Sequence, residues 1–283
     1  MILPFTGGRV SSAQLKAVAK AVSELADDFA DLTTRQEIQL PDIPADRSPE
    51  ILGFLQAAGL SSADSAASVV SSAPENSRDP LGVWEQAEGN LFTLGVSVLA
   101  GRLTGNQTRK TADVAERYGD GSLLLTLRQN LLIPNIPKEK VAQALESLDT
   151  AGLRVHASAF GRGLVVCGRG NRVRAQELVF HLEKQVPLEG IFRIHWSALP
   201  CDCPESPVAD VRVEGERLLH LALGGFVVRD IPAGQLKIRF EQLLAGYKRK
   251  RKEEEAFSDF CRRAGEEELA RLLSDDVEAK RSP

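Results

Sequence analysis

The stretches Thr33-Thr34-Arg35-Gln36 and Thr126-Leu127-Arg128-Gln129 are near copies of each other and lie 93 positions apart. The likeness extends outward, because residues 8–60 align with residues 101–153 without a gap and match at 17 of 53 positions. Chance similarity between two helical segments would not preserve one register over that length. The sequence therefore predicts an internal duplication, with two α/β units packed about a pseudo-twofold axis.

Each copy has the pattern of a helix, a strand and a second helix. Ser11 or Ser12 can cap the first helix, whose apolar residues recur at helical spacing. The segments 32–40 and 123–133 around the two motifs are short and rich in apolar residues, as strands are, and each ends at a proline. A serine-proline pair and a glycine bound the second helix over residues 48–59. This pattern places each Arg-Gln pair on a strand.

Arg35 and Arg128 occupy equivalent positions in the two copies. A single surface arginine is most often solvated and paired with a carboxylate. The repetition favours a different interpretation, because a guanidinium group offers fork-shaped donors that suit carboxylates and small oxyanions. We therefore expect an anion to bind near the pseudo-axis.

The bulk composition excludes several classes of protein. A chain of 283 residues with 43% hydrophobic residues is long enough for two modest domains, or for one domain of repeated halves. A formal net charge of -4 argues against nucleic-acid binding driven by overall charge. No stretch approaches the roughly 20 apolar residues of a membrane span, and the first residues lack the features of a secretion signal. We therefore expect a cytoplasmic protein without a nucleic-acid or membrane partner.

The second copy carries the motifs by which the chain resembles a known family. These motifs are Gly101-Arg102-Leu103-Thr104, Thr126-Leu127-Arg128-Gln129-Asn130 and Ile136-Pro137. They are similar to the ferredoxin-like half-domains of the nitrite/sulfite reductases, and residues 192–197 and 208–215 look like strands of the same family. The resemblance implies an α+β fold: duplicated ferredoxin-like half-domains about a pseudo-twofold axis plus one α/β siroheme-type lobe.

Members of this family bind siroheme, a tetrapyrrole with eight carboxylates, next to a 4Fe-4S cluster, and reduce nitrite or sulfite at the siroheme iron. The resemblance implies an oxidoreductase that acts on such a small inorganic anion and has an electron donor or partner subunit. By matching positions, Arg35 and Arg128 are expected to contact siroheme or the substrate anion as catalytic residues. Arg102, Gln129 and Asn130 are expected to be further cofactor contacts.

The cysteines follow the family pattern only in part. The family's ligands are spaced Cys-x5-Cys and, downstream, Cys-x3-Cys, because one cubane needs four thiolates. Cys167 and Cys203 match the first and last positions, whereas Val173 and Leu199 stand at the other two. Cys201 is an additional thiol.

Three interpretations of these cysteines stay open. Cys167, Cys201 and Cys203 can supply three ligands to an altered cluster. Alternatively, Cys201 and Cys203 can form a redox-active or metal-binding pair, or all three can be buried thiols that behave as small hydrophobic residues. No fourth ligand is evident, because the four histidines are dispersed without metal-ligand spacing.

The order of segments also departs from the family, in which a full siroheme lobe follows each half-domain. Here a segment rich in Ser, Ala and Pro separates the copies, as a linker does. An open alternative is therefore a non-catalytic tetrapyrrole-binding, scaffold or partner protein that has lost its redox centre. The predicted segments are a half-domain (1–60), a linker replacing a lobe (61–90), a half-domain (91–155), a siroheme/iron-sulfur-type α/β lobe (156–247) and charged C-terminal helices (248–283).

Overall fold

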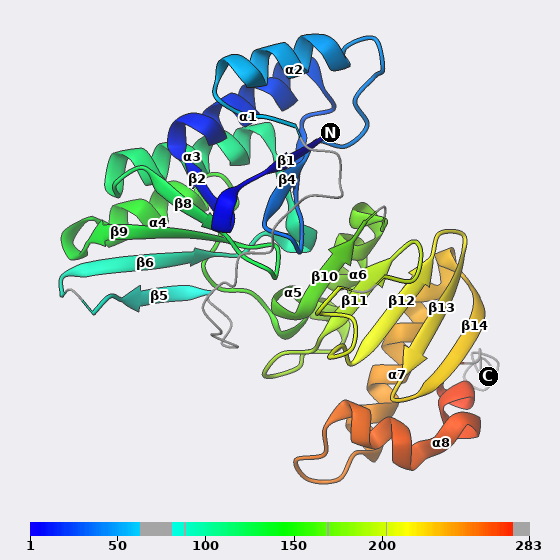
Figure 1. Cartoon of the computed structure of the whole chain (residues 1–283). Coiled ribbons are helices and arrows are strands. Elements are labelled where there is room, and N and C mark those ends of the chain that lie inside the picture. Colours follow the sequence, from blue (N-terminus) through cyan, green and yellow to red (C-terminus); the bar gives the residue numbers. More distant parts are fainter. Residues whose placement is uncertain (63–80, 88, 169, 202, 274–283) are drawn as a thin grey trace, which may run out of the picture. The chain divides into compact units, whose positions relative to one another are not determined.

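The structure is a computed structural model in which the chain forms two compact units, residues 1–157 and residues 158–283 (Figure 1). Within the described part of the chain, no helix combines the length and the apolar composition needed to cross a bilayer. The described residues are 1–62, 81–87, 89–168, 170–201 and 203–273.

The first unit contains the duplicated segment, and its helices repeat with the offset of 93 residues found in the sequence. The first helix of each copy has 14 residues. The elements of the first copy are β1 (Ile2–Pro4), β2 (Arg9–Ser11), α1 (Ser12–Leu25), β3 (Phe29–Leu32), β4 (Glu37–Gln39) and α2 (Ser48–Ala57). Those of the second copy are β6 (Leu91–Val96), β7 (Arg102–Thr104), α3 (Gly105–Tyr118), β8 (Ser122–Leu125), β9 (Leu131–Pro137) and α4 (Val141–Asp149).

Helices α1 and α3 begin in the same way. The Ser11 side chain accepts a hydrogen bond from the Gln14 backbone, and the Gln14 side chain accepts one from the Ser11 backbone. Thr104 and Gln107 form the same capping box on α3. Each box satisfies two backbone N–H groups at the helix start. Of the two predicted caps for α1, the structure uses Ser11.

The two copies exchange one strand each. β7 of the second copy pairs antiparallel with β3 of the first, and β2 of the first copy pairs antiparallel with β8 of the second. The sheets therefore have the orders β1-β4-β3-β7 and β2-β8-β9-β6-β5, where β5 is Gly82–Glu85. Leu32, Leu103 and Leu125 belong to one hydrophobic core to which both copies contribute. Because of this exchange, the two copies fold as one body.

The Arg-Gln pairs lie in turns between two strands, and not on a strand as the sequence predicted. β3 ends at Leu32 and β4 begins at Glu37, and the corresponding turn of the second copy joins β8 to β9. Gln36 and Gln129 both have a φ of 60°. A backbone in this left-handed region cannot continue a strand, so the pattern is a β-hairpin between two helices.

Two further predictions differ from the structure of this unit. β9 continues through Pro134 to Pro137, where the sequence predicted an end at the first proline. A register shift on its partner β6, between Phe92 and Leu94, accommodates this stretch. Strand β5 falls inside the predicted linker, whose residues 63–80 lie outside the described residues.

The second unit is built on one five-stranded sheet of order β10-β11-β12-β13-β14. β10, β11 and β12 are parallel, whereas β13 and β14 add antiparallel strands. Helix α6 packs against β10 and against α7. The strands are β10 (Leu164–Cys167), β11 (Ile194–Ser197), β12 (Val211–Gly215), β13 (Leu218–Leu223) and β14 (Phe226–Pro232). The helices are α5 (Ala159–Gly163), α6 (Arg172–Gln185), α7 (Leu236–Lys250) and α8 (Phe257–Leu273).

The second unit includes both the predicted lobe and the charged C-terminal segment. Helix α7 ends at Lys250, inside the run of charged residues 248–255, and α8 begins only at Phe257. In the loop between them Glu255 accepts a hydrogen bond of 2.6 Å from Arg263 Nε, so opposite charges meet across a loop. Residues 274–283 of the predicted C-terminal helices lie outside the described residues.

Candidate functional site

The two Arg-Gln turns, residues 33–37 and residues 126–130, have the same backbone. In the first, Gln36 N donates to Thr33 O at 3.1 Å and Thr33 N donates to Glu37 O at 3.0 Å. In the second, the equivalent distances are 3.1 Å and 3.0 Å. The turns therefore present Arg35 and Arg128 at equivalent positions of the two copies.

The glutamines of these turns join the two copies to each other. Gln36 Nε2 donates to Leu125 O at 2.8 Å, and Gln129 Nε2 donates to Leu32 O at 2.9 Å. Both side chains are buried, with exposed fractions of 7% and 1%. Gly8 leaves room for this contact, because a Cβ there would lie 2.9 Å from Gln36 Nε2. The motif thus has a structural half, the glutamine, and a more accessible half, the arginine.

The five residues predicted to contact the cofactor differ in their exposure and in their contacts inside the unit. Arg35 is exposed and Arg128 is half-buried. Gln129 makes the buried contact across the pseudo-axis, and Asn130 Oδ1 accepts a hydrogen bond of 2.9 Å from the backbone of Val98. Arg102 is paired with Asp31. The side chains of Gln129, Asn130 and Arg102 are therefore engaged inside the unit, and their role as cofactor contacts stays a prediction.

Arg102 forms a two-pronged ion pair with Asp31. Its Nε and its second terminal nitrogen donate to the two carboxylate oxygens, each at 2.7 Å. The hydrogen bonds to Asp31 raise the pKa of Arg102, against the opposing effect of its partial burial. The pair joins β7 to β3, where these two residues are direct partners in the register.

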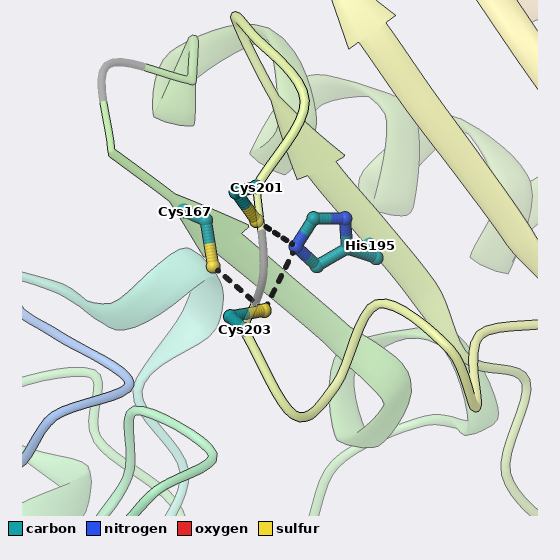
Figure 2. Close-up of side chains that lie close together, drawn as sticks. All are labelled: Cys167, His195, Cys201 and Cys203. Carbon is teal, nitrogen blue, oxygen red and sulfur yellow. Dashed lines mark hydrogen bonds between the residues drawn. The ribbon is translucent and has the colours of Figure 1, made fainter.

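In the second unit, three thiols and one imidazole converge beside two parallel strands, β10 and β11 (Figure 2). One thiol ends β10, the imidazole lies on the adjacent β11, and two thiols lie in the loop that follows β11. We call these residues the thiol-imidazole group: Cys167, His195, Cys201 and Cys203. Ligand sites in sheets of this kind commonly lie at the carboxyl ends of parallel strands.

The ligand atoms of the thiol-imidazole group lie within 4.8 Å of one another. Cys167 Sγ is 3.3 Å from Cys203 Sγ. His195 Nε2 is 3.3 Å from Cys201 Sγ and 3.1 Å from Cys203 Sγ. Cys167 and His195 are buried, whereas Cys201 and Cys203 are half-buried. All three predicted metal-ligating cysteines are therefore brought together, although their ligand role itself stays a prediction.

The surroundings of Cys201 and Cys203 shift their pKa values in opposite directions. A hydrogen bond from Cys167 lowers the pKa of Cys203 to about 3, and His195 adds to this effect against the opposing influence of burial. Burial raises the pKa of Cys201. The group therefore favours a thiolate at Cys203.

His195 is the member that the sequence analysis missed. Its spacing, His-x5-Cys-x-Cys, is a signal that reasoning from the sequence could have used. The deciding fact is that β10 and β11 are adjacent and parallel, with Val165 opposite His195. Residues two apart on a strand face the same side, so Cys167 shares the face of Val165 and His195.

The residues at the two other family cysteine positions, and the fourth cysteine of the chain, lie outside the group. Val173 and Leu199, at the two family cysteine positions, have exposed fractions of 50% and 75%. Cys261 is fully buried on α8, and burial raises its pKa to about 12. Cys261 is thus expected to remain a neutral, unreactive thiol.

Comparison with known proteins finds a family that matches the duplicated unit. The family model described as the nitrite/sulfite reductase ferredoxin-like half domain matches residues 1–58 and 84–151, which include most of both copies. The duplicated unit belongs to the nitrite/sulfite reductase family. The thiol-imidazole group lies outside the residues matched by this family model.

Individual family members match parts of the chain. Ferredoxin-nitrite reductase, chloroplastic, of Zea mays is 33% identical over 150 residues, which are 49% of this chain and 26% of that protein. Sulfite reductase (ferredoxin) 2 of Mycolicibacterium paratuberculosis is 26% identical over 226 residues, which are 68% of this chain and 40% of that protein. The chain thus spans between about a quarter and two fifths of the length of these relatives.

The fold itself has a counterpart among solved structures. The structure of the Mycobacterium tuberculosis NirA protein superposes with a TM-score of 0.78 at 18% sequence identity, covering 95% of this chain and 84% of that chain. Together with the family match, this confirms the predicted α+β fold of the nitrite/sulfite reductase family.

Proposed function

We propose that the chain binds siroheme through the Arg-Gln turns and is the tetrapyrrole-holding part of an oxidoreductase that acts on sulfite or nitrite. The observation that carries the proposal is the pair of equivalent arginines, Arg35 and Arg128, held by identical turns. A carboxylate-rich tetrapyrrole is a ligand to which two such guanidinium groups can bind at once.

The turn backbone explains how the arginines would be positioned. Each arginine precedes a glutamine whose side chain is buried and bonded to the other copy. The buried glutamine fixes the backbone of the turn, and with it the Cα position of the adjacent arginine. The arginine therefore loses less conformational entropy when it binds an anion. The arginines are therefore the part of the motif that this proposal assigns to the ligand.

Contacts inside the unit reduce the number of residues that we assign to cofactor binding. Arg102 would have to leave Asp31 to bind a cofactor carboxylate, and Gln129 would have to leave Leu32 O. Breaking a buried ion pair or a buried hydrogen bond costs free energy that a single new contact rarely exceeds. These contacts assign Arg102 and Gln129 to stabilisation of the unit. We assign binding to Arg35 and Arg128 because the two turns hold them at equivalent positions.

The reaction is proposed by similarity to the relatives, whose names specify nitrite or sulfite reduction with ferredoxin. Siroheme would supply an iron at which the anion is reduced. The part of this chain would be to hold the macrocycle by its carboxylates, while electrons come from a ferredoxin-type donor.

A siroheme titration tests binding directly. We expect the full chain to bind siroheme with a change in its visible spectrum, and Arg35→Ala and Arg128→Ala each to weaken binding roughly 10- to 150-fold, the equivalent of about 1.5–3 kcal/mol for a hydrogen bond to a charged group. Arg117→Ala, which removes an exposed arginine at the end of α3, is the matched control and should bind as the native chain does. Equal affinity of all four proteins would reject the assignment of the turns.

A second assay separates an oxidoreductase from a binding protein. The siroheme-loaded chain should consume sulfite or nitrite with reduced methyl viologen as the electron source. If siroheme binds tightly and neither anion is consumed, the second candidate function holds: a tetrapyrrole-binding or partner protein without a redox centre of its own. The close spacing of the thiol-imidazole group is the observation that favours this second candidate.

A further inference from the structure

The thiol-imidazole group has a geometry that differs from what the family resemblance implies. We propose that Cys167, His195, Cys201 and Cys203 bind one zinc ion, with His195 as the fourth ligand, in place of a 4Fe-4S cluster. This inference goes beyond the proposed function, because it concerns a different unit of the chain and a different ligand.

The separations of the ligand atoms support a single ion. Zinc–sulfur bonds of about 2.3 Å and zinc–nitrogen bonds of about 2.0 Å place tetrahedral ligand atoms roughly 3.5–3.8 Å apart. Three of the six separations between the ligand atoms are 3.1, 3.3 and 3.3 Å, and all ligand atoms lie within 4.8 Å of one another. A small outward movement of the side chains therefore makes room for one ion at the centre.

The same separations do not fit a cubane. In a 4Fe-4S cluster each thiolate binds a different iron at a different corner, so the ligand sulfurs are separated by the cluster itself. In this group Cys167 Sγ and Cys203 Sγ are in direct contact. The residues at the two other family positions, Val173 and Leu199, cannot bind iron and are exposed. The 4Fe-4S cluster that the resemblance implies is therefore not supported by the residues present.

The donor set also matches zinc chemistry. Three cysteines and one histidine form a common ligand set of structural zinc sites. His195 is 2% exposed, and within the described residues its Nδ1 has no hydrogen-bond partner, so the contacts of Nε2 with the two thiols orient the ring. A metal between the imidazole and the two thiols would satisfy Nε2 as a ligand atom, and Nδ1 would then carry the ring proton.

The four protein ligands define what the ion can do. Because they complete a tetrahedron, no position is left for water or substrate, and zinc has no redox chemistry under these conditions. The ion would instead tie the loop that carries Cys201 and Cys203 to the end of β10. Electrons for the proposed reduction would then reach siroheme without passing through this centre.

Metal analysis of the native full chain tests the inference without any mutation. After anaerobic purification from cells supplied with both iron and zinc, we expect one zinc per chain and no acid-labile sulfide. X-ray absorption at the zinc edge should show three sulfur ligands and one nitrogen ligand. Replacement of zinc by cobalt should give the visible absorption of tetrahedral cobalt bound to thiolates.

Variants identify the ligands. His195→Ala, Cys167→Ser, Cys201→Ser and Cys203→Ser should each weaken zinc binding by more than the roughly 10- to 100-fold that loss of an outer partner costs. His156→Ala and Cys261→Ala are the matched controls, because these residues lie outside the group, and both should keep one zinc per chain. In the native chain, a chelator should make three thiols newly reactive, while Cys261 stays protected.

Two results would overturn the inference. Iron and sulfide in equal amounts, with the absorption of a cluster, would show that a cluster binds after all. A metal-free chain with a Cys167–Cys203 disulfide would show a redox pair. Because siroheme binding is tested separately through Arg35 and Arg128, failure of the zinc site leaves the proposed function standing, and the reverse also holds.

Discussion

The two copies of the duplicated segment share their turns and differ in the strand pair that joins them. Each turn has a glutamine with a φ of 60° whose amide crosses to the other copy, at nearly equal distances of 2.8 and 2.9 Å. By contrast, Arg102 faces Asp31 across β7 and β3, whereas its equivalent Arg9 faces Leu124 across β2 and β8. Sequence identity between the repeats therefore marks a shared structural role only where the partner residue is repeated as well.

The largest effect is expected from the contact that is present on one side only. Arg102→Gln leaves the carboxylate of Asp31, which is 3% exposed, without its cation. Loss of one partner from a buried pair costs about 3–5 kcal/mol, and we expect about 2–4 kcal/mol here because the Arg102 side chain keeps 16% exposure. Urea unfolding of the full chain measures this change.

Arg9→Gln is the matched control for this prediction. Arg9 is exposed and lies opposite a leucine, so its replacement should change the free energy of unfolding by no more than about 0.5 kcal/mol. Equal losses for the two variants would mean that the ion pair contributes nothing beyond a surface arginine.

A smaller and symmetric effect is expected at the glutamines. Gln36→Met and Gln129→Met keep the length of the side chain but remove the buried hydrogen bond to the other copy. Each should lower the free energy of unfolding by about 1–3 kcal/mol, because a buried carbonyl loses its donor. If only one variant is destabilised, the pseudo-twofold equivalence of the turns is contradicted.

The smallest effects are expected at the helix caps. Ser11→Ala and Thr104→Ala each remove the side-chain half of a capping box, at a cost of about 1 kcal/mol. Thermal unfolding followed by circular dichroism should show similar shifts for the two variants. Ser12→Ala is the control, since Ser12 was an alternative cap and lies inside the helix. A larger loss for Ser12→Ala than for Ser11→Ala would place the cap at Ser12.

The sequence determined the features that depend on local pattern. The gapless offset of 93 residues was sufficient to predict the duplication, and helix periodicity with capping residues located the first helices. The motifs of the second copy identified the family. Local patterns succeed here because capping and helical spacing act between residues close in the chain.

Contacts between distant residues were decided by the tertiary structure. The Arg-Gln pairs looked like parts of strands, and only the backbone shows that each glutamine turns the chain and bonds to a carbonyl 89 or 97 residues away. Arg102 pairs with Asp31, 71 residues away, because the two copies exchange strands. Such pairings follow from strand register, which no local propensity contains.

The thiol-imidazole group also depends partly on the local sequence and partly on the tertiary structure. The sequence supplied Cys167, Cys201 and Cys203 as candidate ligands, and the spacing of His195 before Cys201 did not by itself show that His195 lies beside Cys167. The parallel pairing of β10 with β11 places His195 and Cys167 on one face of the sheet, and the loop after β11 brings the other two thiols to them (Figure 2). Residue types thus came from the sequence, whereas the fourth ligand and the close spacing that favours one ion came from strand adjacency.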